Sequence, residues 1–184
     1  GVTYRSVLKT VDKEFTNQSI DLLTNELTTV TIPPATEEEI NDTIKVMGGE
    51  DWMLWMEALQ EADVLADGAK TVAYSYIGPE LTYPIYDGSI GQAKQDLYRT
   101  ADKINEHIQG TEAYVAVNKA VVTQSSSAIP IVPLYISILF KVMKELNLHE
   151  GCIEQMYRLV HDRLCVEGGV PTDENHLIRM DDYE

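Results

Sequence analysis

The spacing of apolar residues in the first third of the chain predicts two consecutive helices. Thr36 and the three glutamates after it form a capping box with acidic side chains at the positive end of a helix dipole, so we expect a helix over 37–47. A second helix is expected between Asp51, which can cap it, and Gly68, which can close it. Its apolar residues share one wide face: Trp52, Trp55, Met56 and Leu59. We expect the two tryptophans to be core residues.

Strand-like and helical periods alternate through the rest of the chain. β-branched and aromatic residues over 71–77 predict a strand buried in a sheet, and strand character returns over 113–122. Between these strands, apolar or small residues recur every three or four positions over 90–110, which predicts a long amphipathic helix. Helical patterns also cover 129–148 and 151–164. This order predicts an α/β fold with parallel strands and flanking helices.

The two ends of the chain carry weaker patterns. Residues 1–35 are polar and rich in threonine, with an alternating piece over 27–32, so we expect an extended arm or a small hairpin there. Residues 36–184 are then expected to form the main domain. The glycine-containing, acidic segment over 168–184 is expected to be a loop, which indicates a chain that stops within a domain.

Composition narrows the classes of protein. The 184 residues are 44% hydrophobic, enough for one domain with a core, and 30 acidic against 14 basic residues give a net charge of -16. That charge repels polyanions, so no nucleic-acid binding is expected. No run approaches the roughly 18 apolar residues of a membrane span, and no signal peptide is visible. Two cysteines are too few for a disulfide framework and suit a reducing compartment.

A tyrosine-rich run between the first predicted strand and the long helix is best suited to chemistry. Tyr74, Tyr76, Tyr83 and Tyr86 precede Lys94 in it. A phenol titrates near pH ~10 in water, so it is a poor proton donor at neutral pH unless a cation such as Lys94 lowers its pKa. The pair suits reductases in which a tyrosine serves the developing enolate while a nicotinamide donates hydride. Alternatively, the tyrosines are amphipathic wall residues and Lys94 is a solvated helix residue.

Zinc binding is another candidate chemistry. Zinc ligand types occur three or four residues apart at His149, Cys152, His161 and Cys165. We favour the simpler interpretation that both cysteines are buried thiols and that His149 lies at a helix boundary. The acidic residues near the helix starts are interpreted as caps. We therefore expect no metal site.

Several uncommon blocks of sequence resemble one enzyme family. They are KVMGGEDW at 45–52, AYSYIGPELTYPIYDGSIGQAK at 73–94, VTQSSSAIP at 122–130, PLY at 133–135 and MKE at 143–145. With these blocks the chain is similar, over nearly its whole length, to the trans-2-enoyl-CoA and enoyl-acyl-carrier-protein reductases of the single-chain type. That type occurs in bacteria and in euglenid mitochondria.

This resemblance implies a Rossmann-related, short-chain-dehydrogenase-like fold and NADH-dependent reduction of the 2,3 double bond of a trans-2-enoyl thioester in fatty acid synthesis. The carrier would be CoA or acyl carrier protein (ACP). The match places the proton donor at Tyr86, the cofactor-binding lysine at Lys94 and a substrate contact at Tyr76. A backbone-rich segment that contacts NAD is matched by Val121, Val122 and Thr123. A homo-oligomer or a larger assembly, and a cytoplasmic or mitochondrial location, stay open.

Two departures from the family pattern bear on activity. Seven residues separate Tyr86 from Lys94 where the family has eight, and a deletion inside the helix would rotate Lys94 by about 100°. We expect the Asp87–Gly88 loop to absorb the deletion. A glycine-rich turn that cradles a pyrophosphate is also missing, so we expect a partial domain without the N-terminal nucleotide-binding half, inactive alone. The alternative function is a non-catalytic structural or accessory subunit of a larger complex.

Overall fold

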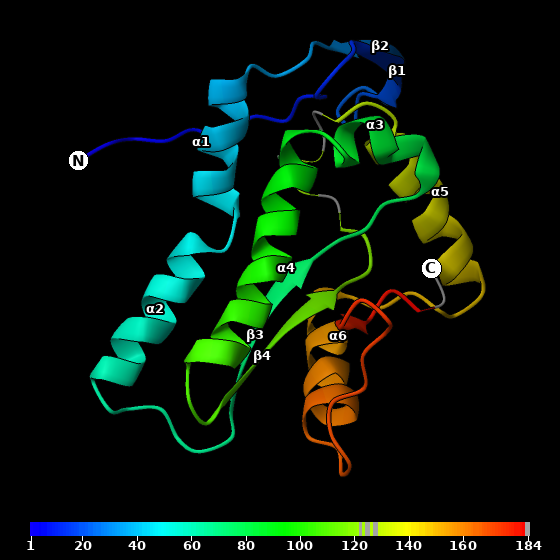
Figure 1. Cartoon of the computed structure of the whole chain (residues 1–184). Coiled ribbons are helices and arrows are strands. Elements are labelled where there is room, and N and C mark those ends of the chain that lie inside the picture. Colours follow the sequence, from blue (N-terminus) through cyan, green and yellow to red (C-terminus); the bar gives the residue numbers. More distant parts are fainter. Residues whose placement is uncertain (122, 124–125, 127–128, 183–184) are drawn as a thin grey trace.

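The computed structural model describes residues 1–121, 123, 126 and 129–182 (Figure 1). Its centre is a three-stranded parallel sheet of β3 (Ala69–Ser75), β4 (Thr111–Val117) and β5 (Leu177–Arg179), in the order β3-β4-β5. The α/β fold with parallel strands is therefore confirmed. In the described part of the chain β3 lies at the edge of this sheet, and of its residues only Ser75 is buried, so the expected buried strand is buried only at its end.

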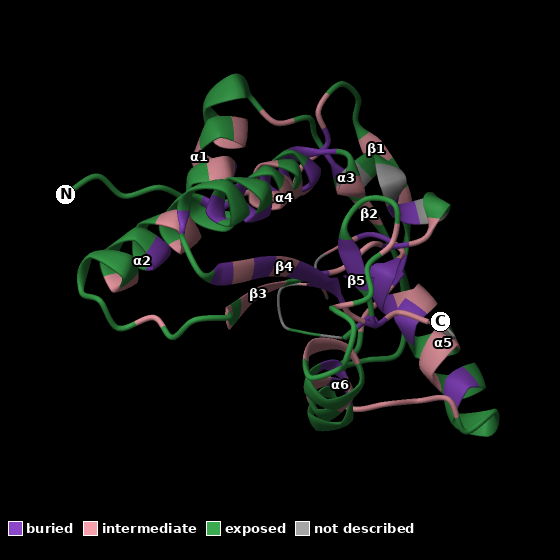
Figure 2. Cartoon of the chain, turned by 60° about the horizontal axis from the view of Figure 1, so that its bottom comes forward, coloured by how far each residue is buried: buried purple, intermediate pink, exposed green. Residues whose placement is uncertain are grey.

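Helices lie on both faces of the sheet (Figure 2). One side carries α1 (Glu37–Met47), α2 (Glu50–Glu61) and the long α4 (Ser89–His107), whereas α6 (Cys152–Leu159) lies on the other. Successive side chains of a strand point to opposite faces, so β4 contributes to both layers. The side chains of β4 in the core with α2 and α4 are Ala113, Val115 and Val117. Those in the core with α6 include Ala116.

Helix α1 begins where the capping box predicted. The Glu39 amide donates to Oγ1 of Thr36 (3.2 Å), and the Thr36 amide donates back to Oε2 of Glu39 (2.9 Å). Each bond satisfies an amide that the first helical turn cannot pair internally. Local sequence alone therefore sets the start of this helix.

Helix α2 differs from its prediction at both ends. It starts at Glu50, before the expected cap Asp51, because tertiary contact replaces a side-chain cap: the Gly49 amide donates to Oδ2 of Asp96 on α4 (3.0 Å). It ends at Glu61 rather than near Gly68, and the chain then turns. A neighbouring helix thus decides where α2 begins.

The N-terminal segment forms the hairpin that the alternating pattern suggested. Strands β1 (Phe15–Ile20) and β2 (Leu27–Ile32) pair antiparallel. The segment is tied to the rest of the protein, since the Lys9 amide donates to Oγ of Ser89 on α4 (3.2 Å). The division of the chain near residue 35 into an arm and a main domain stays a prediction.

Elements of the second half were predicted with wrong limits. β4 ends at Val117 instead of residue 122, and α5 (Val132–Glu145) starts later than residue 129. The segment from 151 to 164 is helical as predicted, with a π-helical turn (Val160–Leu164) after α6. The segment predicted to be a C-terminal loop contains β5, which pairs with β4. The sequence did not indicate this strand because three residues are too few to show an alternating pattern.

Some predictions about buried side chains were wrong. Trp55 is 62% exposed, whereas Trp52 packs against the core and its Nε1 donates to Oγ1 of Thr71 (2.9 Å). Cys152 and Cys165 are exposed, not buried. Helical spacing defines a face but not whether a neighbour covers it. Within the described ranges no group of three or more His, Cys, Asp or Glu could hold a metal ion, and no helix could cross a membrane.

Candidate active site

A cavity of about 120 Å³ lies at the carboxyl end of β3. After β3 the chain forms two short turns, η1 (Glu80–Thr82) and α3 (Tyr83–Tyr86), which line the cavity together with the start of α4 and the start of α5. Four residues named from the sequence meet there: Tyr76, Tyr86, Lys94 and Val121. Because α/β folds bind ligands beyond the carboxyl ends of their strands, this cavity is the candidate active site.

Lys94 is the cation of this cavity. Its Nζ donates a hydrogen bond to the carbonyl oxygen of Tyr76. The same Nζ lies 4.5 Å from the ring centroid of Tyr86 and 5.8 Å from that of Tyr76, distances at which a cation is attracted to an aromatic face. Burial lowers the pKa of Lys94 to about 8, and no carboxylate of the described residues opposes that shift. The ammonium group thus faces two phenol rings with its charge uncompensated.

The short connection between Tyr86 and Lys94 keeps both side chains together. Only Asp87 and Gly88 separate α3 from α4, and Gly88 is the N-cap of α4. A Cβ at Gly91 would overlap the carbonyl oxygen of Tyr86, so a glycine is needed where α3 passes over the first turn of α4. The seven-residue spacing therefore still leaves the Lys94 ammonium over the Tyr86 ring.

Another tyrosine, not predicted from the sequence, reaches the same place. Tyr98 follows Lys94 by four residues on α4, so both lie on one face of the helix. Its hydroxyl lies 2.9 Å from Oγ of Ser75, the last residue of β3, and 3.4 Å from the Tyr86 hydroxyl. The four-residue spacing from Lys94 is a signal that could have identified Tyr98. Ser75 has no such signal, because only the fold brings it close.

The predicted NAD-contacting segment is only partly placed at the cavity. Val121 lines it and is 48% exposed. Thr123 is exposed, bonds through its amide to Oγ of Ser126 (2.7 Å), and is not among the described lining residues. Val122 lies outside the described residues. Near the end of β4, Oδ1 of Asn118 is buried and has no hydrogen-bond partner within the described part of the chain.

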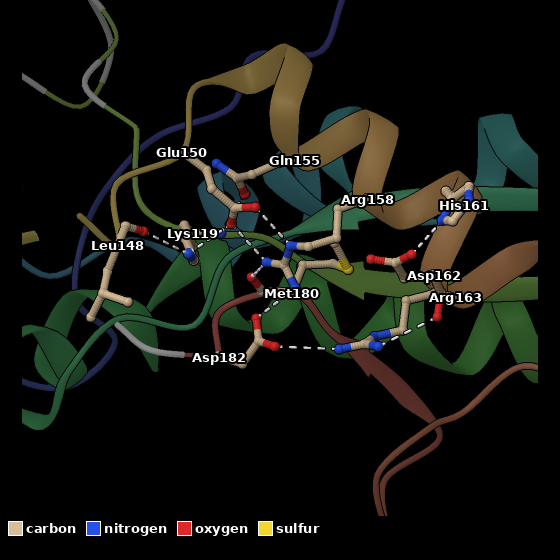
Figure 3. A network of polar contacts seen from close by, with 10 residues as sticks. All are labelled: Lys119, Leu148, Glu150, Gln155, Arg158, His161, Asp162, Arg163, Met180 and Asp182. Carbon is tan, nitrogen blue, oxygen red and sulfur yellow. Dashed lines mark hydrogen bonds and ion pairs between the residues drawn. The ribbon is translucent and has the colours of Figure 1, made fainter. Parts of the chain in front are cut away.

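An ion network anchors the chain between β4 and the cavity (Figure 3). Lys119, 5% exposed, pairs through Nζ with Oε2 of Glu150 (2.7 Å) and donates to the Leu148 carbonyl (3.2 Å). Arg158 on α6 donates to both oxygens of Glu150 (2.8 Å each) and to Oδ1 of Asp182 (2.8 Å). Burial alone would raise the pKa of Glu150, but the hydrogen bonds from Arg158 and Lys119 outweigh it and lower that pKa. The positive charge of Lys119 is thus neutralised by the Glu150 carboxylate.

Residues 1–165 match the family model described as the trans-2-enoyl-CoA reductase catalytic region. The chain belongs to the trans-2-enoyl-CoA reductase family. It is 60% identical over 187 residues to the trans-2-enoyl-CoA reductase (NADH) of Clostridium perfringens, covering 100% of this chain and 48% of that protein. It is also 55% identical over 187 residues to the enoyl-acyl-carrier-protein reductase (NADH) of Flavobacterium johnsoniae, covering 100% of this chain and 47% of that protein.

The crystal structure of Treponema denticola trans-2-enoyl-CoA reductase in complex with NAD is similar in fold. The TM-score is 0.96 at 48% sequence identity, over 100% of this chain and 46% of that chain. The family resemblance identified from the sequence blocks is therefore confirmed. Our chain spans about half the length of the curated reductases it matches.

Proposed function

We propose that this chain carries the catalytic residues for NADH-dependent reduction of the 2,3 double bond of a trans-2-enoyl thioester. One observation carries the proposal: the Lys94 ammonium, with no opposing carboxylate in the described residues, lies 4.5 Å from the Tyr86 ring centroid in a largely apolar cavity. An uncompensated cation beside a phenol is costly for stability and useful for proton transfer. The names of the relatives support the reaction and its cofactor.

The reaction needs a hydride on one carbon and a proton on the next. NADH, when bound, supplies the hydride to the β carbon. The Tyr86 hydroxyl donates its proton on the enolate side, and the Lys94 ammonium stabilises the phenolate that forms. This stabilisation is stronger than in water because the site is partly desolvated. Lys94 is itself held by the carbonyl of Tyr76, whose side chain we assign to substrate contact.

The residues around the cavity fit the reacting end of NADH rather than the whole dinucleotide. The cavity, about 120 Å³, is smaller than the roughly 300–1,000 Å³ of complete ligand sites. Lys94, which lines the cavity, can donate to a ribose hydroxyl. We assign the cofactor contact to Lys94 and the 121–123 segment. Neither β3 nor β4 is followed by a glycine-rich turn for a pyrophosphate.

The remaining cavity wall suits an aliphatic acyl chain. It is apolar where α5 begins and where α4 faces it, through Ile90, Ile129, Val132 and Ile136. None of the described lining residues discriminates CoA from acyl carrier protein, so both thioesters are substrates to test. A structural subunit is the less favoured alternative, because the short spacing that motivated it leaves Lys94 beside Tyr86.

Tyr86→Phe tests the proposal in the natural protein that contains this chain. Removing the hydroxyl is expected to lower kcat for NADH-dependent reduction of crotonyl-CoA by about 10²- to 10⁴-fold, the usual contribution of a general acid. Tyr74→Phe is the matched control, because Tyr74 is 60% exposed on β3 and outside the cavity lining. Unchanged reduction in Tyr86→Phe would contradict the proposal. A stoichiometric complex that binds no NADH would favour the structural subunit.

A further inference from the structure

The hydroxyl of the candidate proton donor, Tyr86, is followed by two further hydroxyls from two other elements, those of Tyr98 and Ser75. We propose that Tyr98 is a positioning residue that donates a hydrogen bond to the Tyr86 oxygen, while Ser75 holds the Tyr98 hydroxyl in place. This inference rests on the proposed function, since it assigns a partner to the proton donor. It adds a residue of α4 and a residue of β3 to the site.

The placement of Tyr98 follows from helix geometry and from the sheet. Tyr98 lies one turn beyond Lys94 on α4, so a single helix presents a cation and a hydroxyl to Tyr86. The Tyr98 ring packs against the core of α2, α4 and β4, which restrains its position. Ser75 is 8% exposed at the end of β3, with Oγ 2.9 Å from the Tyr98 hydroxyl. Rigid elements therefore hold both ends of this pair.

The direction of the hydrogen bonds gives Tyr98 its role. A hydroxyl has one proton, so Tyr98 can donate to Tyr86 only while it accepts from Ser75. Once Tyr86 has given up its proton, its phenolate oxygen can only accept, and a bond donated by Tyr98 stabilises it. The 3.4 Å between the two phenol oxygens is long for such a bond, and catalytic hydrogen bonds commonly shorten when substrate binds. Tyr98 thus adds a neutral donor to the charge of Lys94.

Few other titratable groups face Tyr86 among the described residues. Lys94 of α4 and Tyr76 after β3 are the titratable side chains that share its cavity. The lining residues from the N-terminal segment and from 121–136 carry no titratable group. On its other side Tyr98 lines a second cavity, about 300 Å³, that also includes Asp102, Tyr114 and His176. Titration of these groups can therefore also affect the pH profile of Tyr98 variants.

A double-mutant cycle in the natural protein tests the role of Tyr98. Tyr98→Phe keeps the packed ring and removes the hydroxyl, and it is expected to lower kcat with crotonyl-CoA by about tenfold to a hundredfold, with KM for NADH unchanged. In the Tyr86→Phe background the same substitution is expected to have almost no further effect, because its target is gone. Ser75→Ala is expected to lower kcat by about threefold through the weakened hold on Tyr98.

The outcomes separate this inference from the proposed function. If Tyr86→Phe abolishes reduction but Tyr98→Phe leaves kcat unchanged, the role of Tyr98 is disproved and the reductase assignment survives. If Tyr98→Phe lowers kcat equally in both backgrounds, or raises KM for NADH in parallel, the residue is structural and the inference fails. If Tyr86→Phe itself leaves kcat unchanged, the proposed function fails first. Tyr74→Phe, with an exposed phenol on β3, should match the parent in every assay.

Discussion

Lys94 and Lys119 are both shielded from water, but Lys119 has a carboxylate partner and Lys94 has none among the described residues. Lys119 meets Glu150 at 2.7 Å in a network that also contains Arg158, so its charge is neutralised where it is buried. Among the described residues Lys94 meets a backbone carbonyl and aromatic rings but no carboxylate, and burial lowers its pKa to about 8. Compensated charge anchors the chain, whereas uncompensated charge is available for chemistry. Of the two, Lys94 is therefore expected to carry activity and Lys119 stability.

The largest effect is expected from Lys94→Met, which keeps the length of the side chain and removes its charge. Reduction of crotonyl-CoA by the natural protein should fall about 10²- to 10⁴-fold, because the Tyr86 phenolate loses its cation. The midpoint of urea unfolding should stay the same or rise, since an uncompensated buried charge has been removed. Lys103→Met, on an exposed position of the same helix, is the control for both assays. Equal activity of Lys94→Met and Lys103→Met would contradict the assignment of activity to Lys94.

Lys119→Met should show the reverse pattern. Glu150 keeps Arg158, so the free energy of unfolding is expected to fall by about 2–3 kcal/mol, somewhat below the usual cost of removing one partner of a buried pair. Urea titration of the natural protein measures this loss. Lys70→Met breaks the more exposed 3.9 Å pair with Glu112 and should cost less than about 1 kcal/mol. A loss at Lys119 no larger than at Lys70 would mean that the network is not an anchor.

A pH dependence of both stability and activity is expected from Lys94. Its pKa is about 8 in the folded protein against 10.5 for a free lysine, so the unfolded chain binds more protons between these values. The free energy of unfolding should therefore gain a contribution from Lys94 as pH rises from 8 to 10.5, while activity that needs the charged lysine declines through pH 8. Comparing unfolding and kcat of the parent protein and Lys94→Met across this window isolates both trends. If the pH curves of the parent protein and Lys94→Met are parallel, a group other than Lys94 causes the pH dependence.

Local sequence was sufficient for several elements, whereas the central pair of the candidate site was named by the family resemblance. The capping box at Thr36 located the start of α1, and the three-to-four spacing after Ile90 located α4. The alternation of helix and strand indicated the parallel sheet. Phenol and ammonium chemistry, together with the family resemblance, singled out Tyr86 and Lys94, which the fold does place together. Such features depend on residues within a few turns of one another.

Tertiary structure decided everything that needed a distant partner. β5 forms by pairing with β4, and α2 starts where the Gly49 amide donates to Asp96. Trp55 is exposed because none of the described residues covers it. Ser75 reaches Tyr98 across 23 positions of sequence, and Lys119 reaches Glu150 across 31, separations that no local period records. A side chain carries its chemistry in the sequence, but the protein's topology selects whether that side chain meets a carboxylate, a phenol or water.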